Sequence, residues 1–392
     1  MLTFVLFFAM VPETVCVKNV RAAENPQEYL DGNPLLPKYV EKVFDGLSNK
    51  GNYVRPSAKQ ILSDYEKSSQ YQKHPRIMIT KQIVDDQLKP IASNTNDPRN
   101  ALYNKIMTRA DNLCVWIVDQ KSQDQLPKYS YKYESRMPVN GDPDKPSGGN
   151  TSDDFKYKIM VLGFAYQMTD VAAQKKRYAE AAWKILERIT NSYESNVDSN
   201  DNFKDVNPWH NLDFGTFSQG LAIGYDWFYD AWDAEKKERL QNAIVRLCFQ
   251  VANESYAKKS IFKEVKHNLQ KSKLGTGNMK GVEYVHNHNS FVNSGVIMAA
   301  LALIDEYPET ASTLCQDAFR SMEKNLNEYY PSGLSNESPQ YWLFSMDNFS
   351  MIFSTLETAL EIGGQERIKA RRELRNSLPL ETLLAANNPS SA

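Results

Sequence analysis

From residue 74 onward, apolar residues recur at intervals of three and four positions, the spacing of one face of an α-helix. The alternating pattern that indicates strands is scarce. One helical stripe carries Tyr178, Ala181, Ala182, Ile185, Leu186 and Ile189. We therefore expect an all-α protein, with helices near 81–92, 98–120, 154–169, 175–194, 213–231, 234–257, 290–305, 309–328 and 346–362.

Helices that pair without a heptad repeat are typical of α/α barrels, or toroids, and of helical solenoids. No clear sequence repeat supports a solenoid, so we expect an incomplete (α/α) toroid of helical hairpins. Residues 213–231 and 290–305 are the most apolar helices and are expected to lie on its inside. The loops that precede them, 207–211 and 286–289, should then line one cleft at the same end.

The N-terminus has the pattern of a signal peptide. An apolar run at 2–11 is too short to span a bilayer, and a small-residue site follows at 21–23. We therefore expect a secreted or periplasmic protein with no membrane attachment after signal removal. The expected organisation is a signal peptide at 1–23, an irregular segment at 24–73, the toroid at 74–365 and a disordered tail at 366–392.

Charge argues against a nucleic-acid-binding protein, which would show a basic face. The formal net charge is −2 and the pI is about 6.3. Residues 258–280 form one basic stretch, with seven lysines and a single acid, Glu264. That stretch is either a solvated face or a positive rim that attracts a polyanion. The oligomeric state is left open by the sequence.

No metal or cofactor motif is present, so no cofactor is expected. The sequence has no phosphate-binding glycine loop, no two-histidine helix motif and no Ser-His-Asp nucleophile elbow. Three scattered cysteines after the signal region do not form a disulfide framework or a zinc site, and we expect buried free thiols at Cys114, Cys248 and Cys315.

Polar residues crowd the start of the helix predicted at 290–305. Asn287, His288 and Asn289 precede its apolar run directly. An amide beside an imidazole can hold a carboxylate and move a proton near neutral pH. Helix capping is the structural alternative, because Asn289 or Ser290 is a good N-cap. The two roles are compatible, since a helix N-terminus also favours an anion.

Two further groups of residues suit carbohydrate chemistry. Tyr341 can act as a catalytic phenol, with Glu337 orienting it or a sugar hydroxyl, and Trp342 lies beside it. Trp209 suits stacking on a sugar ring, and His210 suits a carboxylate or hydroxyl. Ordinary packing between helices explains each of these groups equally well.

Four stretches occur in order along the chain: HPRIMIT at 74–80, the stretch 207–213 running into LAIGYDWFY at 221–229, the Asn-His-Asn entry at 287–289, and 333–342. Together they resemble the N-terminal helical domain of the heparinase II/III-like polysaccharide lyases, which are related to alginate lyases with an α/α toroid. The resemblance covers roughly residues 74–363. Ser332 stands where the family commonly has aspartate, and His288 where many relatives have tryptophan. Family members usually continue into a β-sandwich domain, which we expect to be missing from this chain.

The resemblance implies β-elimination on a uronic-acid polysaccharide. Asn287 or Asn289 would bind the substrate carboxylate and so stabilise the enolate-like intermediate. His288 and Tyr341 would share the proton transfer, with Tyr341 protonating the leaving oxygen. Trp209, His210, Glu337 and Trp342 would bind the sugars.

Two other functions remain open. A glycoside hydrolase on an α/α barrel needs two carboxylates across the scissile bond, for which Asp213, Asp226, Glu283 and Glu337 are candidates. A non-catalytic toroid that binds polyanionic glycans is the third possibility. The sequence does not identify the uronide, nor whether the chain is active without a β-sandwich.

Overall fold

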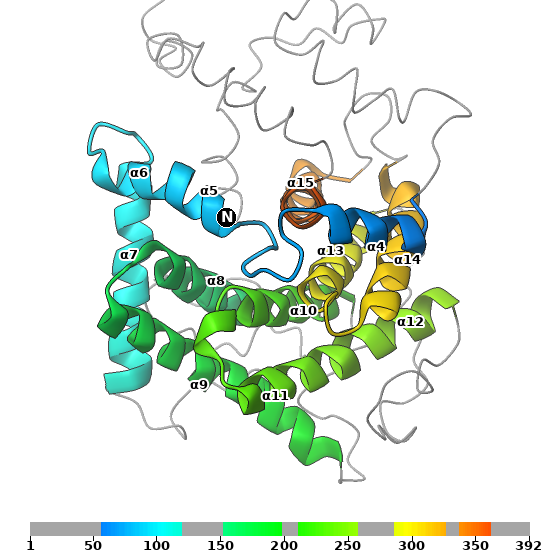
Figure 1. Cartoon of the computed structure of the whole chain (residues 1–392). Coiled ribbons are helices and arrows are strands. Elements are labelled where there is room, and N and C mark those ends of the chain that lie inside the picture. The colour runs from blue at the N-terminus through cyan, green and yellow to red at the C-terminus, as the bar shows by residue number, and fades with distance from the viewer. Residues whose placement is uncertain (1–55, 120–151, 198–210, 258–285, 327–336, 362–392) are drawn as a thin grey trace, which may run out of the picture.

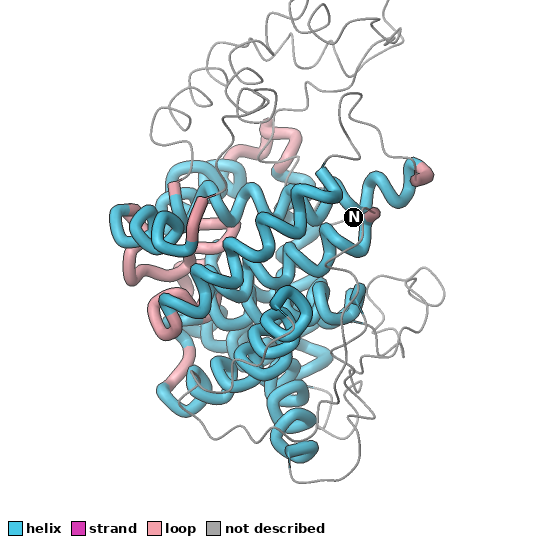
Figure 2. Tube along the Cα trace, turned by 90° about the vertical axis from the view of Figure 1, so that its right-hand side faces the viewer, coloured by secondary structure: helices cyan, strands magenta, loops and turns pink. Residues whose placement is uncertain are grey.

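The computed structural model describes residues 56–119, 152–197, 211–257, 286–326 and 337–361 (Figure 1). Within these ranges the ordered elements are all helical and no strand occurs (Figure 2). The prediction of an all-α fold is therefore confirmed. None of the described helices is long and apolar enough to cross a membrane.

The helices begin and end close to the predicted positions. In chain order they are α4 (Ala58–Lys67), α5 (Lys81–Ile83), η1 (Val84–Leu88), α6 (Lys89–Ser93), α7 (Asn100–Cys114), η2 (Val115–Asp119), α8 (Ser152–Met168), α9 (Ala172–Val197), α10 (Asn211–Asp226), η4 (Tyr229–Ala231), α11 (Ala234–Ile244), η5 (Val245–Phe249), α12 (Gln250–Ala257), α13 (Asn287–Ala302), α14 (Pro308–Leu326) and α15 (Pro339–Leu360).

Two boundaries differ from the sequence analysis. Helix α4 lies inside the segment 24–73, interpreted as irregular; the Ser57 side chain caps it, and Ile61 and Tyr65 bury its apolar face. Helix α15 begins at Pro339 rather than near 346, because Ser338 occupies the N-cap position and proline suits the first helical turn.

The helices form two rows. An inner row consists of α8, α10, α13 and α15, and each of these contacts the next. An outer row of α7, α9, α11, α12 and α14 covers it, and α4 packs on α14 (Figure 1). Helices α10 and α13 are buried on nearly all sides, as predicted for inner helices. Closure of the rows into a toroid stays a prediction.

Helices α10, α13 and α15 run parallel with their N-termini at the same end. Gly215, near the start of α10, is so close to α13 that a β-carbon there would lie 2.3 Å from the Phe291 carbonyl oxygen. One level further along, a β-carbon on Gly295 of α13 would lie 2.9 Å from the β-carbon of Ser218. Gln219 of α10 reaches α15 at the same level, because its Nε2 donates to Asn348 Oδ1 at 2.7 Å. We call the two ends of this row its N-terminal end and its C-terminal end.

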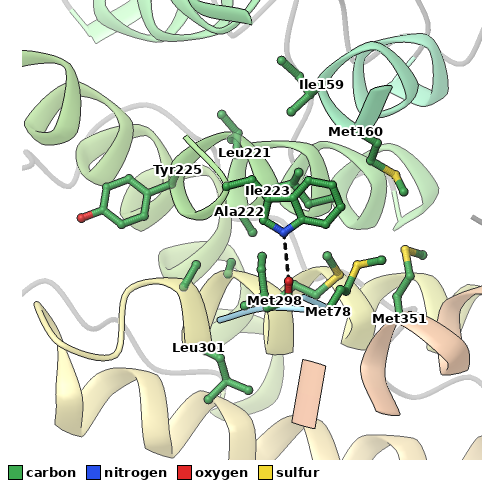
Figure 3. Close-up of a cluster of buried hydrophobic side chains, with 14 of the residues drawn as sticks. Met78, Ile159, Met160, Leu221, Ala222, Ile223, Tyr225, Met298, Leu301 and Met351 are labelled. Carbon is green, nitrogen blue, oxygen red and sulfur yellow. Dashed lines mark hydrogen bonds between the residues drawn. The ribbon is translucent and has the colours of Figure 1, made fainter. Parts of the chain in front are cut away.

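The segment that precedes α5 closes the C-terminal end. Asp226, at the end of α10, accepts hydrogen bonds from the backbone N–H groups of Arg76 (2.9 Å) and Ile77 (3.0 Å). Trp227 Nε1 donates to the Ile77 carbonyl at 2.9 Å. Met78 then enters the core, where Met298 and Met351 lie beside it (Figure 3). The HPRIMIT stretch thus anchors the N-terminal part of the described chain to the inner row.

The cysteines at 114, 248 and 315 are buried free thiols, as expected. Burial raises the pKa of the Cys114 and Cys248 thiols to about 12. A thiol protonated at neutral pH is a poor nucleophile, so these side chains act as small apolar groups in the core.

Candidate functional site

Glu337 joins the starts of two inner helices. It precedes α15, and its carboxylate accepts hydrogen bonds from the backbone N–H of Asn287 (2.8 Å) and from Asn287 Nδ2 (2.6 Å) at the start of α13. The first N–H groups of a helix have no partner within the helix and carry partial positive charge. The carboxylate therefore caps α13 from a position 50 residues away in the sequence.

The side-chain amide of Asn287 has one orientation that satisfies Glu337. A carboxylate only accepts hydrogen bonds, so the nitrogen of the amide faces Glu337 and Oδ1 points elsewhere. Asn287 is 2% exposed, and its Oδ1 has no hydrogen-bond partner among the described residues. A buried acceptor without a partner costs free energy, so this oxygen is a candidate ligand-binding atom.

Two histidines flank Asn287 in the sequence. His286 occupies the N-cap position of α13, where its Nδ1 is 3.4 Å from the His288 backbone nitrogen. The ring of His288, in the first turn, packs edge to face against the ring of His286, with the ring centroids 4.9 Å apart. Both side chains are half-buried. His288 thus lies in the first turn of α13, the helix start predicted for it.

Tyr341 lies in the first turn of α15, which starts beside α13. It is 44% exposed, and no hydrogen bond of its hydroxyl occurs among the described residues. The centroid of its ring lies 6.0 Å from that of Phe344, whose centroid lies 6.3 Å from that of Phe291 in α13. Trp342 is partly buried against the core. The structure therefore brings Asn287, His288, Glu337 and Tyr341 to the N-terminal end of the inner row.

Asn289 has a different setting from the other predicted catalytic residues. It is fully buried, and its Nδ2 donates to Ser321 O (3.2 Å) and Ser321 Oγ (3.0 Å) of α14. Its Oδ1 accepts from Asn293 Nδ2 at 2.8 Å. Asn293 Oδ1 in turn accepts from Tyr256, whose pKa burial raises well above its ordinary value. The Asn289 amide is thus committed to helix–helix contacts.

The remaining predicted residues lie either on helix α10 or outside the described residues. Trp209 and His210 are outside the described residues, as are Glu283 and the basic stretch 258–280. Asp213 is buried in the first turn of α10, at the N-terminal end. Asp226 is at the opposite end and is occupied by the HPRIMIT segment.

Lys156 of α8 is a residue that the sequence analysis missed. It is 8% exposed and makes no hydrogen bond or ion pair among the described residues. Lysine is almost never buried without a partner. A signal was present in the sequence, because Lys156 lies three and four positions before Ile159 and Met160, on the apolar stripe of a predicted helix.

No family model and no characterised protein matches this chain.

Proposed function

We propose that this protein cleaves a uronic-acid-containing polysaccharide by β-elimination. The observation that carries the proposal is the bridge between Glu337 and Asn287. It draws the starts of α13 and α15 together, so that an imidazole and an exposed phenol share one end of the inner row. A proton acceptor and a proton donor are the two groups that β-elimination needs.

His288, Tyr341 and Asn287 have separate roles in the proposed reaction. His288 takes the proton from C5 of the uronate, and the C–H electron pair forms the C4–C5 double bond. The bond between C4 and the leaving oxygen breaks, and the Tyr341 hydroxyl gives that oxygen its proton. Asn287 binds the sugar, because its free Oδ1 accepts from a hydroxyl and its second Nδ2–H can donate to the uronate carboxylate.

Glu337 acts in this scheme as a positioning residue. Both of its oxygens accept from Asn287, which fixes the amide with its oxygen turned away from the carboxylate. Asn289 has no part in the proposal, since both ends of its amide bind Ser321 and Asn293.

Glycoside hydrolysis is the second candidate, and one observation favours it. Asp213 and Glu337 both lie at the N-terminal end, as a pair of catalytic carboxylates would. The engagement of both Glu337 oxygens by Asn287 counts against it. The products separate the two reactions, because a lyase leaves a double bond and a hydrolase adds water.

The test is ultraviolet absorbance of the unsaturated product, measured with the full chain on alginate, heparin-like and other uronate polymers. Tyr341→Phe is expected to lower turnover about 10²- to 10⁴-fold, while the free energy of unfolding changes by less than about 0.5 kcal/mol. Tyr71→Phe is the matched control, because Tyr71 is 43% exposed near the C-terminal end; it should change neither quantity.

Each alternative has its own outcome. New reducing ends without ultraviolet absorbance would identify a hydrolase. Binding without any cleavage, retained in Tyr341→Phe, would identify a glycan-binding module. Cleavage by Tyr341→Phe at the wild-type rate would remove Tyr341 from the mechanism.

A further inference from the structure

The proposed reaction needs a group that neutralises the substrate carboxylate, and the start of α13 offers for this only the uncharged Nδ2–H of Asn287. The Glu337 carboxylate already occupies the positive end of that helix, and Asn289 is committed to α14. A cation with no protein partner would supply what is missing. Lys156 is such a cation, because it is buried and has no ion pair among the described residues.

The direction of the Lys156 side chain follows from its helix. Met160 is one turn further along α8 and gathers beside Met78, with Met298 of α13 and Met351 of α15 (Figure 3). Residues four apart lie on the same helix face. Lys156 therefore projects toward the same interior, one turn nearer the N-terminal end.

On each of the four inner helices a polar residue stands four positions before a buried apolar residue. An apolar layer is formed by Met160, Ile223, Met298 and Met351, which Figure 3 labels. Four residues before each of these stand Lys156, Gln219, Ser294 and Asp347, which we call the polar layer. The interior thus changes from apolar to polar within one helical turn, toward the end where Asn287 and Tyr341 lie.

The polar layer is only partly satisfied by the protein. Gln219 Nε2 donates to Ser294 Oγ (3.0 Å) and to Asn348 Oδ1 (2.7 Å). Its Oε1 is buried and has no hydrogen-bond partner among the described residues. The backbone of Lys156 packs against Gly220, the residue after Gln219, since a β-carbon on Gly220 would lie 3.3 Å from Lys156 Cα. A free cation and a free amide acceptor therefore occupy the same layer.

We propose that the polar layer is the floor of the sugar-binding site, and that the Lys156 ammonium binds the carboxylate of the uronic acid there. Gln219 Oε1 accepts a hydrogen bond from a hydroxyl of the same sugar. This inference rests on the proposed function, because it assigns the substrate carboxylate to a residue. It makes Lys156 the residue that distinguishes uronates from neutral sugars.

The test compares two buried lysines of α8. Lys158 is equally enclosed, but its Nζ binds Asp154 at 2.5 Å and it lies over the Trp116 ring at 5.3 Å. In Lys156→Met a mostly enclosed side chain loses a charge that has no ion pair among the described residues, so the melting temperature should not fall. In Lys158→Met the temperature should fall, because Asp154 loses its partner. A fall in Lys156→Met would show that Lys156 is paired, with Asp347 for example, and would overturn the proposal.

Binding is measured by calorimetry with alginate and galacturonate tetrasaccharides and with their carboxyl-reduced forms. For the charged sugar that the wild type binds, Lys156→Met should weaken binding roughly 10- to 100-fold. Lys156→Gln, which keeps polarity without charge, should do the same. Lys158→Met should retain wild-type affinity, and the carboxyl-reduced sugar should bind the wild type and Lys156→Met equally.

The outcomes separate this inference from the lyase proposal. Binding that depends on Lys156, without cleavage, would support the carboxylate site while the lyase proposal fails. Cleavage with unchanged affinity and KM in Lys156→Met would leave the lyase standing and overturn the role of Lys156. Failure of the wild type to bind either charged tetrasaccharide also overturns it.

Discussion

The two ends of the inner row use similar polar residues in opposite ways. At the C-terminal end, Asp226 accepts from two backbone N–H groups and from His74 Nδ1 at 2.6 Å. The Arg76 guanidinium contacts His74 and Tyr65, and binds Asp305 at 2.6 Å. Because arginine only donates, His74 Nε2 accepts and its proton lies on Nδ1, toward Asp226. Each ring nitrogen of the histidine thus has a defined partner.

At the N-terminal end the polar side chains lie nearer the surface, although both ends contain buried atoms with no partner among the described residues, Arg76 Nε and Glu306 Oε2 being those at the C-terminal end. His288 and Tyr341 are half-buried or exposed, and Asn287 Oδ1 has no described partner. Lys156 and Gln219, one layer further in, also keep a free cation and a free oxygen among the described residues. A polar group that stays unsatisfied reduces stability, so its presence indicates a ligand more strongly than its residue type does.

The electrostatics of the C-terminal end indicate a structural role for its charged residues. Burial alone would lower the pKa of the Arg76 guanidinium, but Asp226, Tyr65 and Asp305 together hold it above its ordinary value. His74 also stacks on Tyr229, with the ring centroids 3.7 Å apart, and Lys237 Nζ lies 3.5 Å from the centroid of the Tyr229 ring. The C-terminal end is therefore a structural clamp.

The largest expected effect is on that clamp. Asp226→Asn removes a buried charge beside Arg76, and when its side-chain oxygen stays on the backbone N–H groups of Arg76 and Ile77, its NH2 group faces the donor His74 Nδ1–H. We expect the free energy of unfolding to fall by about 3–5 kcal/mol, measured by urea denaturation. Asp230→Asn is the control, because Asp230 is exposed on η4 and should change stability by less than about 0.5 kcal/mol. Equal effects of the two changes would mean that the clamp is not structural.

A second prediction concerns the close approach of α10 and α13 near the N-terminal end. Gly215→Ala would place a β-carbon 2.3 Å from a backbone oxygen of Phe291, which cannot move alone. Alanine favours a helix by about 1 kcal/mol over glycine, yet we expect a net loss of about 2 kcal/mol from overpacking. Turnover should also fall, since the start of α13 would shift.

Gly224→Ala serves as the comparison on the same helix. Its β-carbon would meet the side chain of Leu186 at 2.7 Å, and a leucine side chain can change rotamer. The loss should be smaller, and turnover should be retained, because Gly224 lies near the C-terminal end. A smaller loss at position 215 than at 224 would contradict the tight contact between α10 and α13.

Much of the fold was predictable, because helical periodicity is a local property. The stripe from Tyr178 to Ile189 is buried as expected, and α10 and α13 are inner helices as predicted. The start of α15 was misplaced because Tyr341 and Leu343 are exposed, so its first turns show no apolar stripe. Helix α4 escaped notice because a polar segment surrounds its two buried residues, Ile61 and Tyr65.

The candidate site was predictable in composition but not in pairing. The sequence placed Asn287, His288 and Tyr341 among the candidates. It did not reveal that Asn289 binds Ser321, 32 residues away, or that Asn287 binds Glu337, 50 residues away. Such pairings depend on how helices cross, which periodicity does not determine. The buried lysine was visible on a helical stripe, but only the packing shows that it lacks a partner.

The smallest effect is expected from Glu337→Gln, which makes the same carboxylate-to-amide change as Asp226→Asn at the other end. Glutamine can still accept from the Asn287 backbone N–H, but the charge at the start of α13 and the bond from Asn287 Nδ2 are lost. Since Glu337 is half-buried, water can replace part of the interaction. We expect the free energy of unfolding to fall by about 1 kcal/mol. Because salt screens the Glu337 charge in the wild type, the difference between wild type and variant should shrink as the salt concentration rises.

Glu337→Gln and Asp226→Asn should be measured side by side, for both stability and turnover. If the two ends differ as argued, Asp226→Asn should be several-fold more destabilising, while only Glu337→Gln should lower turnover beyond its effect on stability. The reason is that a freed Asn287 amide can rotate and turn its nitrogen toward the position where a sugar hydroxyl donates. Equal losses of stability, with turnover unchanged in Glu337→Gln, would make the Glu337–Asn287 bridge a second clamp and leave His288 and Tyr341 without the positioning that the proposed elimination needs.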